Sequence, residues 1–381
     1  MARRHSRRRR SSNEGSFLGN LVLFALSCLV GLMVAEGAAW LVQPPAKPGM
    51  PQNLLERGPG DVWRVTPGFR GVMDNRVDFR DATVTADSDG VRLVPAAPAE
   101  APRRLLVIGD SQTFGHGLSD EESWPNRLQQ DLNLRGVTAR VVNMGVPGVN
   151  IDQYENRIIL LGSQIQPTDT VLIGVSWNDL ITPPSAAEVN KLVEGYLVSA
   201  ASATNVEEVR ARVRFFEFTG IVVPPFQSTK EFFDSMSQSS ALVGLLYPRV
   251  KAIYYRLRSH SPVAGLVKDG VPEANVVKLR QLADMVASHG ARIVVALLPE
   301  RMFFEDDAYA IYSVNGREFP TQDFMASLAL PHCEKLGLTC LNAFPLLHDH
   351  HRDGLVFKVD GHFNAKGAAL LGPWLAGQLY P

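Results

Sequence analysis

Short apolar runs alternate with longer amphipathic stretches from position 104 to the end of the chain. The first run, Leu105-Leu-Val-Ile108, is apolar without a break, which is the pattern of a strand buried on both faces of a sheet. Strands are predicted at 105–108, 139–143, 170–175, 292–298 and 338–342. Helices are predicted at 122–134, 151–161, 273–289, 322–336 and 365–379. This alternation predicts an α/β fold, in which a parallel sheet lies between two layers of helices.

The composition agrees with such a fold, because 45% apolar and 20% charged residues describe a chain of 381 residues that can bury a core. The formal net charge of −1 hides an asymmetry. Positions 1–16 carry six arginines against one glutamate, a local charge of +5, so the rest of the chain carries −6. A short basic block of this kind suits nucleic acid or anionic lipid, and the sequence that follows it decides between them.

The sequence after the basic block is a candidate membrane span. Positions 17–42 contain one charged residue, Glu36, and positions 18–35 alone are long enough to cross a hydrocarbon core. Arginines before a first span stay in the cytoplasm, so we interpret the cluster as a topology signal and not as a nucleic-acid site. The chain is therefore predicted to be a single-pass membrane protein with a basic cytoplasmic tail (1–16) and an anchor (17–42). Its catalytic domain is then periplasmic or extracellular.

Two alternatives to an uncleaved anchor remain. The small residues Gly37-Ala38-Ala39 resemble a cleavage site, which would make the segment a signal peptide, although the apolar run is longer than a typical signal core. A twin-arginine signal is disfavoured, since the rest of that pattern is missing. Glu36 lies at the far end of the span, where a carboxylate reaches interfacial water, and we expect no functional role for it.

Two further segments surround or interrupt the main domain, which is predicted at 103–381. A Pro-rich linker at 43–102 holds this domain off the membrane and includes a small β element at 61–94. Residues 183–272 break the alternation of strands and helices and are predicted to form a mostly helical insertion beside the site.

Within this insertion, an amphipathic charged stretch occupies 206–214 and an apolar run occupies 242–257. The aromatic residues Phe215, Phe216 and Phe218 are interpreted as local core and not as ligand contacts.

The chain has three cysteines. Cys28 lies in the span, whereas Cys333 and Cys340 flank a predicted helix-to-strand turn. Outside the cytoplasm this pair can form a disulfide, but we favour two buried free thiols that behave as small apolar residues. Their spacing matches no zinc pattern.

Four polar segments lie where predicted strands end, and ligands of open α/β sheets bind at this carboxyl edge. Each segment alone is a common turn or helix cap, but their joint occurrence at strand ends indicates a site. They are Gly109-Asp110-Ser111, Asn143-Met-Gly145-Val-Pro-Gly148, Gly174-Val-Ser-Trp-Asn178-Asp179 and Asp360-Gly-His362-Phe-Asn364.

These residue types suit nucleophilic catalysis. The Ser111 hydroxyl needs a base to take its proton, and His362 is the best candidate because imidazole titrates near neutral pH. Asp360 is the candidate carboxylate that fixes the tautomer of His362 and stabilises its charged form. The backbone N–H groups of Ser111 and Gly145 and the side-chain amide of Asn178 are candidate donors to an oxyanion. Glycine at 145 lets the backbone approach a substrate without an intervening Cβ.

Together these segments resemble the SGNH (GDSL-type) hydrolase superfamily, in a membrane-anchored bacterial form. Its four signature residues correspond to Ser111, Gly145, Asn178 and His362. Gly109-Asp-Ser-Gln-Thr-Phe-Gly115 is similar to the first block of the superfamily and Asp360-Gly-His-Phe-Asn-Ala-Lys-Gly367 to the last. The resemblance covers about 103–381, apart from the insertion. It implies a flavodoxin-like three-layer α/β/α domain that hydrolyses or transfers acyl esters, with no cofactor and no metal.

The sequence departs from the superfamily pattern at three points. Gln112 stands where the namesake motif has leucine, and two extra residues separate Gly174 from Asn178. Asp360 and His362 are two positions apart instead of the commoner three, a spacing that membrane-associated polysaccharide acetylation proteins of the superfamily share. Asp353 is therefore kept as a reserve orienting carboxylate.

Other site types are less well supported. An α/β-hydrolase needs Gly-x-Ser-x-Gly after a strand, and Gly174-Val-Ser-Trp-Asn178 lacks the last glycine. The cluster His348-Asp-His-His351 is the best metal-like group, but it lacks the helical i, i+4 spacing of zinc sites. A phosphate loop with Gly-Lys-Ser/Thr is absent from the sequence, so nucleotide hydrolysis is unsupported. From another class, a non-catalytic carbohydrate-binding protein that keeps the fold remains the alternative.

The predicted function is that of a serine-dependent esterase or acyl hydrolase acting outside the cytoplasm. Its candidate substrates are O-acylated polysaccharides, glycans or lipids of the cell envelope. An O-acyltransferase uses the same residues, because transfer requires only that an acceptor hydroxyl outcompete water. The acyl chain and the acceptor depend on how residues 183–272 close over the site.

Overall fold

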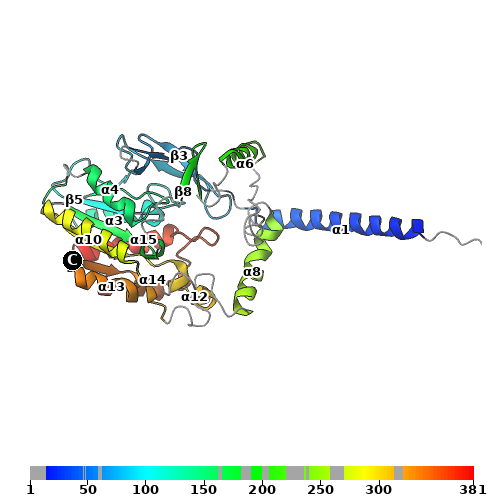
Figure 1. The fold of residues 1–381 in the computed structure, drawn as a ribbon. Helices are drawn as coiled ribbons and strands as arrows, with labels where there is room; N and C mark the ends of the chain where they lie inside the picture. The colour runs from blue at the N-terminus through cyan, green and yellow to red at the C-terminus, as the bar shows by residue number, and fades with distance from the viewer. Residues whose placement is uncertain are drawn as a thin grey trace, which may run out of the picture.

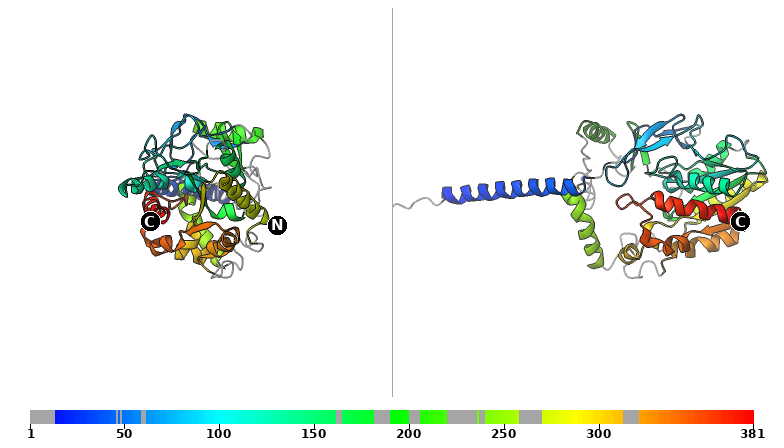
Figure 2. Two further views of the ribbon diagram at one scale, coloured as in Figure 1. Left: turned by 90° about the vertical axis from the view of Figure 1, so that its left-hand side faces the viewer. Right: turned by 180° about the vertical axis from the view of Figure 1, so that it is seen from behind.

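The computed structural model describes residues 14–45, 47, 49–58, 62–161, 165–181, 190–199, 206–219, 236, 240–257, 270–312 and 321–381. A long helix, α1 (Glu14–Val42), projects from a domain built on a central sheet (Figures 1 and 2). Of the helices in this described part, one is long and apolar enough to cross a membrane: its apolar stretch, Gly19–Val42, has a mean hydropathy of 2.2 and is exposed apart from a few residues near its end, such as the buried Ala39. These properties fit an anchor or a signal sequence, and the arginine cluster before α1 lies outside the described residues.

Among the described residues, five parallel strands form the central sheet in the order β11-β10-β7-β5-β6. The strands are β5 (Arg104–Gly109), β6 (Arg140–Asn143), β7 (Thr170–Val175), β10 (Arg292–Leu297) and β11 (Thr339–Asn342). This is the doubly wound, flavodoxin-like order, with the switch point between β5 and β7. The predicted fold class is confirmed.

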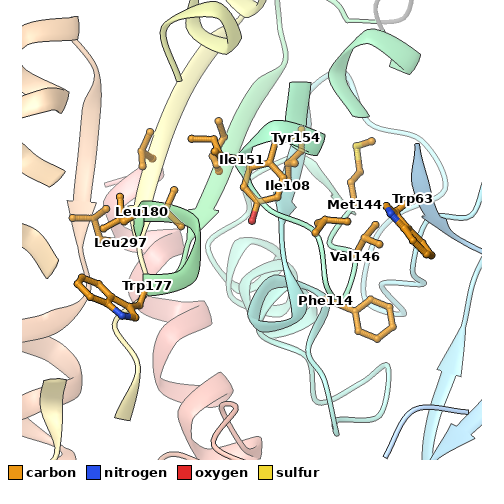
Figure 3. Packing of buried hydrophobic residues seen from close by; sticks show 14 of the residues in the cluster. Trp63, Ile108, Phe114, Met144, Val146, Ile151, Tyr154, Trp177, Leu180 and Leu297 are labelled. Carbon is orange, nitrogen blue, oxygen red and sulfur yellow. The ribbon is translucent and has the colours of Figure 1, made fainter. Parts of the chain in front are cut away.

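Helices cover both faces of the sheet, and each strand contributes alternate residues to the two layers. Leu105 and Val107 of β5 join one buried cluster, while Leu106 and Ile108 join the other. The cluster of Leu105 packs under α3 (Trp124–Leu134), α14 (Phe344–Asp349) and α15 (Ala365–Leu379). The opposite cluster packs under α4 (Ile151–Leu161), α10 (Glu273–Ser288) and α13 (Phe324–Leu336); Figure 3 shows part of it.

Several short elements were not predicted from the sequence. They are α2 (Ser111–Phe114), α5 (Trp177–Ile181), α11 (Arg301–Phe304), α12 (Asp306–Tyr312) and the 3₁₀ helix η4 (His351–Asp353). Elements of one or two turns carry too few residues for an apolar periodicity to emerge. Most of them follow strands, so they shape the carboxyl edge of the sheet.

The segment before β5, predicted to be a linker with a small β element, is packed against the domain. It forms two antiparallel pairs, β1 (Leu55–Arg57) with β2 (Trp63–Val65) and β3 (Arg70–Met73) with β4 (Ala82–Thr85). Trp63, Val65 and Met73 are buried in the same cluster as the central sheet. This β element is therefore part of the domain core.

The insertion contains a β-hairpin that the helical prediction missed. Strands β8 (Asn190–Val193) and β9 (Tyr196–Ser199) are joined by Glu194 and Gly195, whose φ angles are 51° and 80°. Two successive positive φ angles are the mark of a type I′ hairpin turn. The helices α6 (Val206–Thr219) and α8 (Ala241–Leu257) lie where amphipathic and apolar runs were predicted. The side chains of Phe215, Phe216 and Phe218 lie outside the described part.

Cys333 and Cys340 form a disulfide, so the expectation of two free thiols is wrong. Helix α13 ends at Gly337, which adopts the left-handed conformation with φ 65°. This short reversal brings Cys333 opposite Cys340 on β11, with a Cα–Cα distance of 6.2 Å. The sequence spacing gave no information on whether the two side chains face each other.

Glu36, for which the sequence predicted no functional role, has a structural one. Its carboxylate accepts hydrogen bonds from the Ser240 hydroxyl (2.7 Å) and from the backbone N–H groups of Ala241 (2.7 Å) and Leu242 (3.1 Å). These N–H groups belong to the first turn of α8 and lack partners within the helix. Glu36 of α1 is thus the N-terminal cap of a helix about 200 residues away in the chain.

Candidate active site

Strand β5 leads directly into the turn that carries Ser111. Asp110 is the N-cap of α2, and its carboxylate accepts a hydrogen bond from the Gln112 N–H at 2.9 Å. Ser111 is the first residue of α2 and is partly exposed. Its backbone N–H has no acceptor among the residues that the structure describes. Both the hydroxyl and the N–H of Ser111 are therefore presented at the carboxyl edge of the sheet.

Two facing glycines seat this turn on the sheet. Gly109 of β5 pairs with Gly174 of β7. A Cβ on Gly109 would lie 2.0 Å from Thr113 Oγ1, and one on Gly174 would lie 2.3 Å from the same atom. The absence of both side chains lets Thr113, and with it α2, approach the strands closely.

His362 lies between Ser111 and Asp360. Its Nε2 is 2.7 Å from Ser111 Oγ, and its Nδ1 is 2.5 Å from Asp360 Oδ1. The carboxylate accepts from Nδ1–H, which leaves Nε2 to accept the proton of the serine hydroxyl. The reserve carboxylate, Asp353, instead contacts Nδ1 of His350 at 3.0 Å. The structure thus joins Ser111, His362 and Asp360 into one hydrogen-bonded chain.

The negative charge of Asp360 and the positive charge of protonated His362 stabilise each other. Burial alone would raise the pKa of Asp360, but hydrogen bonds from His116 and His362 hold the pKa well below its ordinary value. Burial lowers the pKa of His362, but the hydrogen bond and charge of Asp360, with smaller effects of Asp110 and Glu300, raise it above its ordinary value overall. Asp360 is therefore a permanent anion that stabilises the protonated form of His362.

His116 is a second histidine at the same carboxylate, and the sequence analysis missed it. It is buried, its Nε2 lies 3.5 Å from Asp360 Oδ2, and its ring centroid lies 4.7 Å from that of His362. Burial lowers the pKa of His116, although the hydrogen bond to Asp360 opposes that shift. His116 therefore occupies the carboxylate oxygen that His362 leaves free. Its place in the turn after Ser111 was the available signal.

His116, Asp360 and His362 have donor atoms within 4.8 Å of one another, which is also close enough for metal ligation. However, both ring nitrogens of His362 are already within hydrogen-bond distance of Asp360 and Ser111. This arrangement favours proton transfer. The other metal-like cluster, at 348–351, pairs with a carboxylate on α12. Asp306 lies 3.6 Å from His348 Nε2 and 3.3 Å from His351 Nε2.

The loop that carries His362 is fixed by residues from distant parts of the chain. The Asp78 carboxylate accepts hydrogen bonds from the N–H groups of Lys358 (3.1 Å), Val359 (3.0 Å) and Asp360 (2.8 Å). On the other side of His362, the Phe363 N–H donates to Gln112 Oε1 at 3.2 Å. This contact gives a physical reason for glutamine at position 112, since the leucine of the superfamily motif has no acceptor.

We expect Asp78→Asn to lower kcat for an acyl ester between about 10- and 100-fold, because a small displacement of a catalytic group has effects of this size. The amide has one acceptor oxygen where the carboxylate has two, so the three N–H groups lose a common acceptor. The matched control is Asp81→Asn, an exposed position with φ 53° that asparagine tolerates. Equal kcat values for the two variants would show that Asp78 does not position His362.

The segment between Gly174 and Asn178, which is two residues longer than the superfamily pattern, contacts Asp110 and Phe303. Asn178 is exposed on α5, and its side chain hydrogen-bonds to Asp110. The preceding Ser176 donates from its hydroxyl to Asp110 Oδ1 at 3.1 Å, and Trp177 is buried against Phe303. Burial raises the pKa of Asp110, and the Gln112 N–H, the His362 charge, Ser176 and Asn178 oppose that shift.

Gly145 is placed differently from the expected oxyanion donor. It is buried, and its N–H donates to Asn143 Oδ1 at 3.1 Å. A Cβ at this position would lie 2.3 Å from the backbone nitrogen of Phe114, so glycine is needed here for the packing of α2. The other glycine of the same loop, Gly148, is exposed and has φ 78°.

Glu300 is a further titratable group that sequence reasoning overlooked. It lies three residues after β10, at the N-cap of α11, and is partly buried. Burial and the negative charge of Asp110 raise the pKa of Glu300 to about 7, although the charge of His362 opposes them. Its position at a strand end was the signal that could have identified it.

A cavity of about 1110 Å³ borders the loop that carries His362, through Phe357 and Lys358, although Ser111, Asp360 and His362 do not line it. Phe79, Gly117 and Phe357 line it, and Phe79 also contacts the ring of His116. Its other lining residues include both cations and anions, namely Arg80, Arg301, Arg352, Lys358, Lys366, Asp78, Glu122, Glu305, Asp306, Asp307 and Asp353. A lining of mixed charge offers many donors and acceptors to a polar ligand.

The parallel sheet and the hydrogen-bonded serine and histidine at its edge are the features of a serine hydrolase of the three-layer α/β class. The chain belongs to the GDSL-like lipase/acylhydrolase family, whose model matches residues 107–370.

Individual relatives are more distant. An arylesterase of Vibrio mimicus is 32% identical over 120 residues, which span 31% of this chain and 59% of that protein. The acetylxylan esterase Axe2 of Geobacillus stearothermophilus has 11% identity and a TM-score of 0.39, with 74% of this chain and 95% of that one covered. The carbohydrate acetylesterase Est24 of Sinorhizobium meliloti has 12% identity and a TM-score of 0.36, with 73% and 98% covered. Such distant similarity of structure carries no information about the substrate.

Proposed function

We propose that the chain is a serine-dependent esterase in which Ser111 is the nucleophile, His362 the base and Asp360 the orienting carboxylate. The observation that carries this proposal is the 2.7 Å contact between His362 Nε2 and Ser111 Oγ, with Asp360 on the opposite ring nitrogen. His362 takes the hydroxyl proton as Ser111 Oγ bonds to the acyl carbon. The charged imidazole then gives this proton to the leaving alcohol, and an acyl-enzyme remains. Water repeats the sequence and releases the acid and the free serine.

The oxyanion of the tetrahedral intermediate needs donors near Ser111. We assign two of them to the Ser111 backbone N–H and the Asn178 amide, which are both at the exposed edge of the sheet. Gly145 is the third donor expected from the sequence. Its N–H donates to Asn143 Oδ1 at 3.1 Å, so an oxyanion would have to replace that contact.

An acyl ester of the cell envelope is the proposed substrate, with O-acylated polysaccharide as the first candidate. The mixed-charge cavity that borders the loop of His362 suits a polar, hydroxyl-rich ligand better than a long hydrocarbon chain, and we assign the leaving alcohol to it. O-acyl transfer to a saccharide uses the same residues and is the second candidate, because the cavity that binds a leaving alcohol also binds an acceptor alcohol.

We further propose that α1 is an uncleaved anchor and that the domain lies outside the cytoplasm. Cleavage after Gly37-Ala38-Ala39 would remove Glu36 and leave the first turn of α8 without its cap. The disulfide between Cys333 and Cys340 also favours an oxidising compartment.

A panel of acyl esters, assayed with and without saccharide acceptors, tests the proposed function. Hydrolysis of short acyl esters supports the esterase, and acyl transfer that exceeds hydrolysis supports the transferase. A serine-directed phosphonate provides the direct test of the nucleophile. If the folded protein stays unlabelled while a known serine esterase reacts, the chain is instead a non-catalytic binding protein.

The pH dependence should report the state of His362, since only the neutral ring accepts the Ser111 proton. We expect kcat/KM to fall as the pH decreases through the pKa of His362, with a midpoint above the ordinary histidine value because this pKa is raised. Asp360→Asn removes the main raising influence, so the midpoint should move to lower pH. Glu300→Gln should move it in the same direction by less. An unchanged midpoint in Asp360→Asn would contradict the assignment.

A further inference from the structure

Helix α8 carries an apolar stripe on its surface. Leu246, Val250 and Ile253 are 48%, 59% and 56% exposed. Their spacing of four and three residues places them on one face of the helix. Arg249 beside them is also exposed. Large apolar side chains that form a continuous exposed stripe mark an interaction surface.

The first turn of α8 is held next to the C-terminal end of α1. Glu36 caps the first turn of α8, and it lies six residues before the end of the apolar stretch Gly19–Val42. At 1.5 Å per residue, this is about 9 Å from the end of that stretch. The stretch of 24 residues is about 36 Å long, which exceeds a hydrocarbon core of about 30 Å. Glu36 and the first turn of α8 therefore lie close to the boundary of the hydrocarbon core when α1 crosses a bilayer.

The direction of α8 supports the same placement. Figures 1 and 2 show α8 crossing the axis of α1 at a steep angle, starting from the end of α1 that faces the domain. A helix that crosses a membrane-spanning helix in this way runs along the membrane surface. Helix α8 also contacts α12, which belongs to the domain. The helix thus lies between the domain and the position of the bilayer.

We propose that the stripe formed by Leu246, Val250 and Ile253 is a lipid-docking surface, with α8 lying in the interface of the bilayer that α1 crosses. An interfacial helix of this type buries apolar side chains at the boundary of the acyl chains and keeps basic residues among the headgroups. Glu36 holds the start of α8 against the end of α1, which is the proposed membrane anchor. We therefore identify a lipid surface as the partner of the apolar stripe. This inference rests on the anchoring role proposed for α1.

Docking of α8 also orients the catalytic edge. The loop before α15, which carries His362, extends toward α8 and α1, and the C-terminus of the chain lies on the far side of the domain (Figures 1 and 2). The site would then open toward the membrane surface.

Fluorophores at single cysteines in the full-length protein test the proposal. Cys28 is the free cysteine in the described residues, and it provides the reference position within the span. Val250→Cys and Ile253→Cys, each combined with Cys28→Ala, probe the stripe. Leu134→Cys in the same background is the matched control, because Leu134 is an 86% exposed apolar residue of α3. Each protein is labelled with a nitrobenzoxadiazole dye and reconstituted into phosphatidylcholine–phosphatidylglycerol vesicles that contain doxyl-labelled lipid.

We expect lipid quenching at positions 250 and 253 to be several-fold stronger than at 134, and strongest for shallow doxyl groups. At Cys28, deeper doxyl groups should quench best. If Cys28 is quenched while 250 and 253 behave like 134, the docking surface is refuted and the anchor stands. If Cys28 itself is not quenched, the anchor fails, and the proposal fails with it. Quenching at 250 that depends on protein density and not on doxyl lipid would assign the stripe to a second copy of the chain and would also refute it.

Discussion

Replacement of Ser111 by alanine is expected to lower kcat for p-nitrophenyl acetate by about 10⁴- to 10⁶-fold, the range seen when a serine nucleophile is removed from a hydrolase. The hydroxyl is within 2.7 Å of His362 Nε2, so no neighbouring hydroxyl can take its place without moving the base. Ser288→Ala is the matched control, because Ser288 is exposed at the end of α10 and its hydroxyl donates to the Met285 carbonyl. Its kcat should stay within about twofold of the original value, since an exposed substitution has little effect.

His362→Ala should cause a loss of similar size, and the double variant with Ser111→Ala should be no worse than either single one. Groups that act as a unit in one step show this failure of additivity. Full activity in Ser111→Ala or His362→Ala would refute the mechanism. Losses that multiply in the double variant would show that the two side chains act in separate steps.

The largest expected loss of stability is at Arg92. Its side chain is 1% exposed and donates to Asp120 Oδ1 (3.1 Å) and to the carbonyl oxygens of Phe114 (2.6 Å), Gly115 (2.8 Å) and Leu118 (2.5 Å). Burial lowers the pKa of Arg92, and the charge of Asp120 opposes this effect. Removal of the guanidinium would leave the buried Asp120 carboxylate without its counter-charge and would take one donor from each of three carbonyl groups.

We therefore expect Arg92→Met to lower the free energy of unfolding by about 3 to 5 kcal/mol, the cost of breaking a buried ion pair from one side. Urea unfolding followed by circular dichroism measures this change. The control, Arg103→Met, removes an exposed arginine and should change stability by less than about 0.5 kcal/mol. Equal unfolding midpoints for the two variants would contradict a clamping role of Arg92 in the turn that follows Ser111.

The elements that the sequence predicted well are those with a strong apolar pattern. The strand at 170–175 and the helix at 365–379 have the predicted bounds, because a continuous run and a repeating apolar face each specify one environment. The hairpin of β8 and β9 was missed because its strands are short and its turn depends on positive φ angles at Glu194 and Gly195.

For the site, the sequence pointed to residues that follow strands, and the structure brings Ser111, His362 and Asp360 together. The residues that support the site could not be predicted from local sequence patterns. Asp78 contacts Lys358 across 280 positions, and Glu36 contacts Ala241 across 205. Such contacts depend on the packed arrangement of the whole chain, and a single sequence carries no record of them.

The segment between Val42 and Leu55 has a consequence for which molecules the enzyme can meet. A chain of this length spans at most on the order of 40 Å when fully extended. With α1 in a bilayer, this tether confines the catalytic edge to a thin layer next to the lipid. An ester held in that layer is encountered at a high effective concentration, as in an intramolecular reaction. Esters free in solution must instead diffuse into the layer, so a high KM for soluble esters is compatible with fast turnover at the surface.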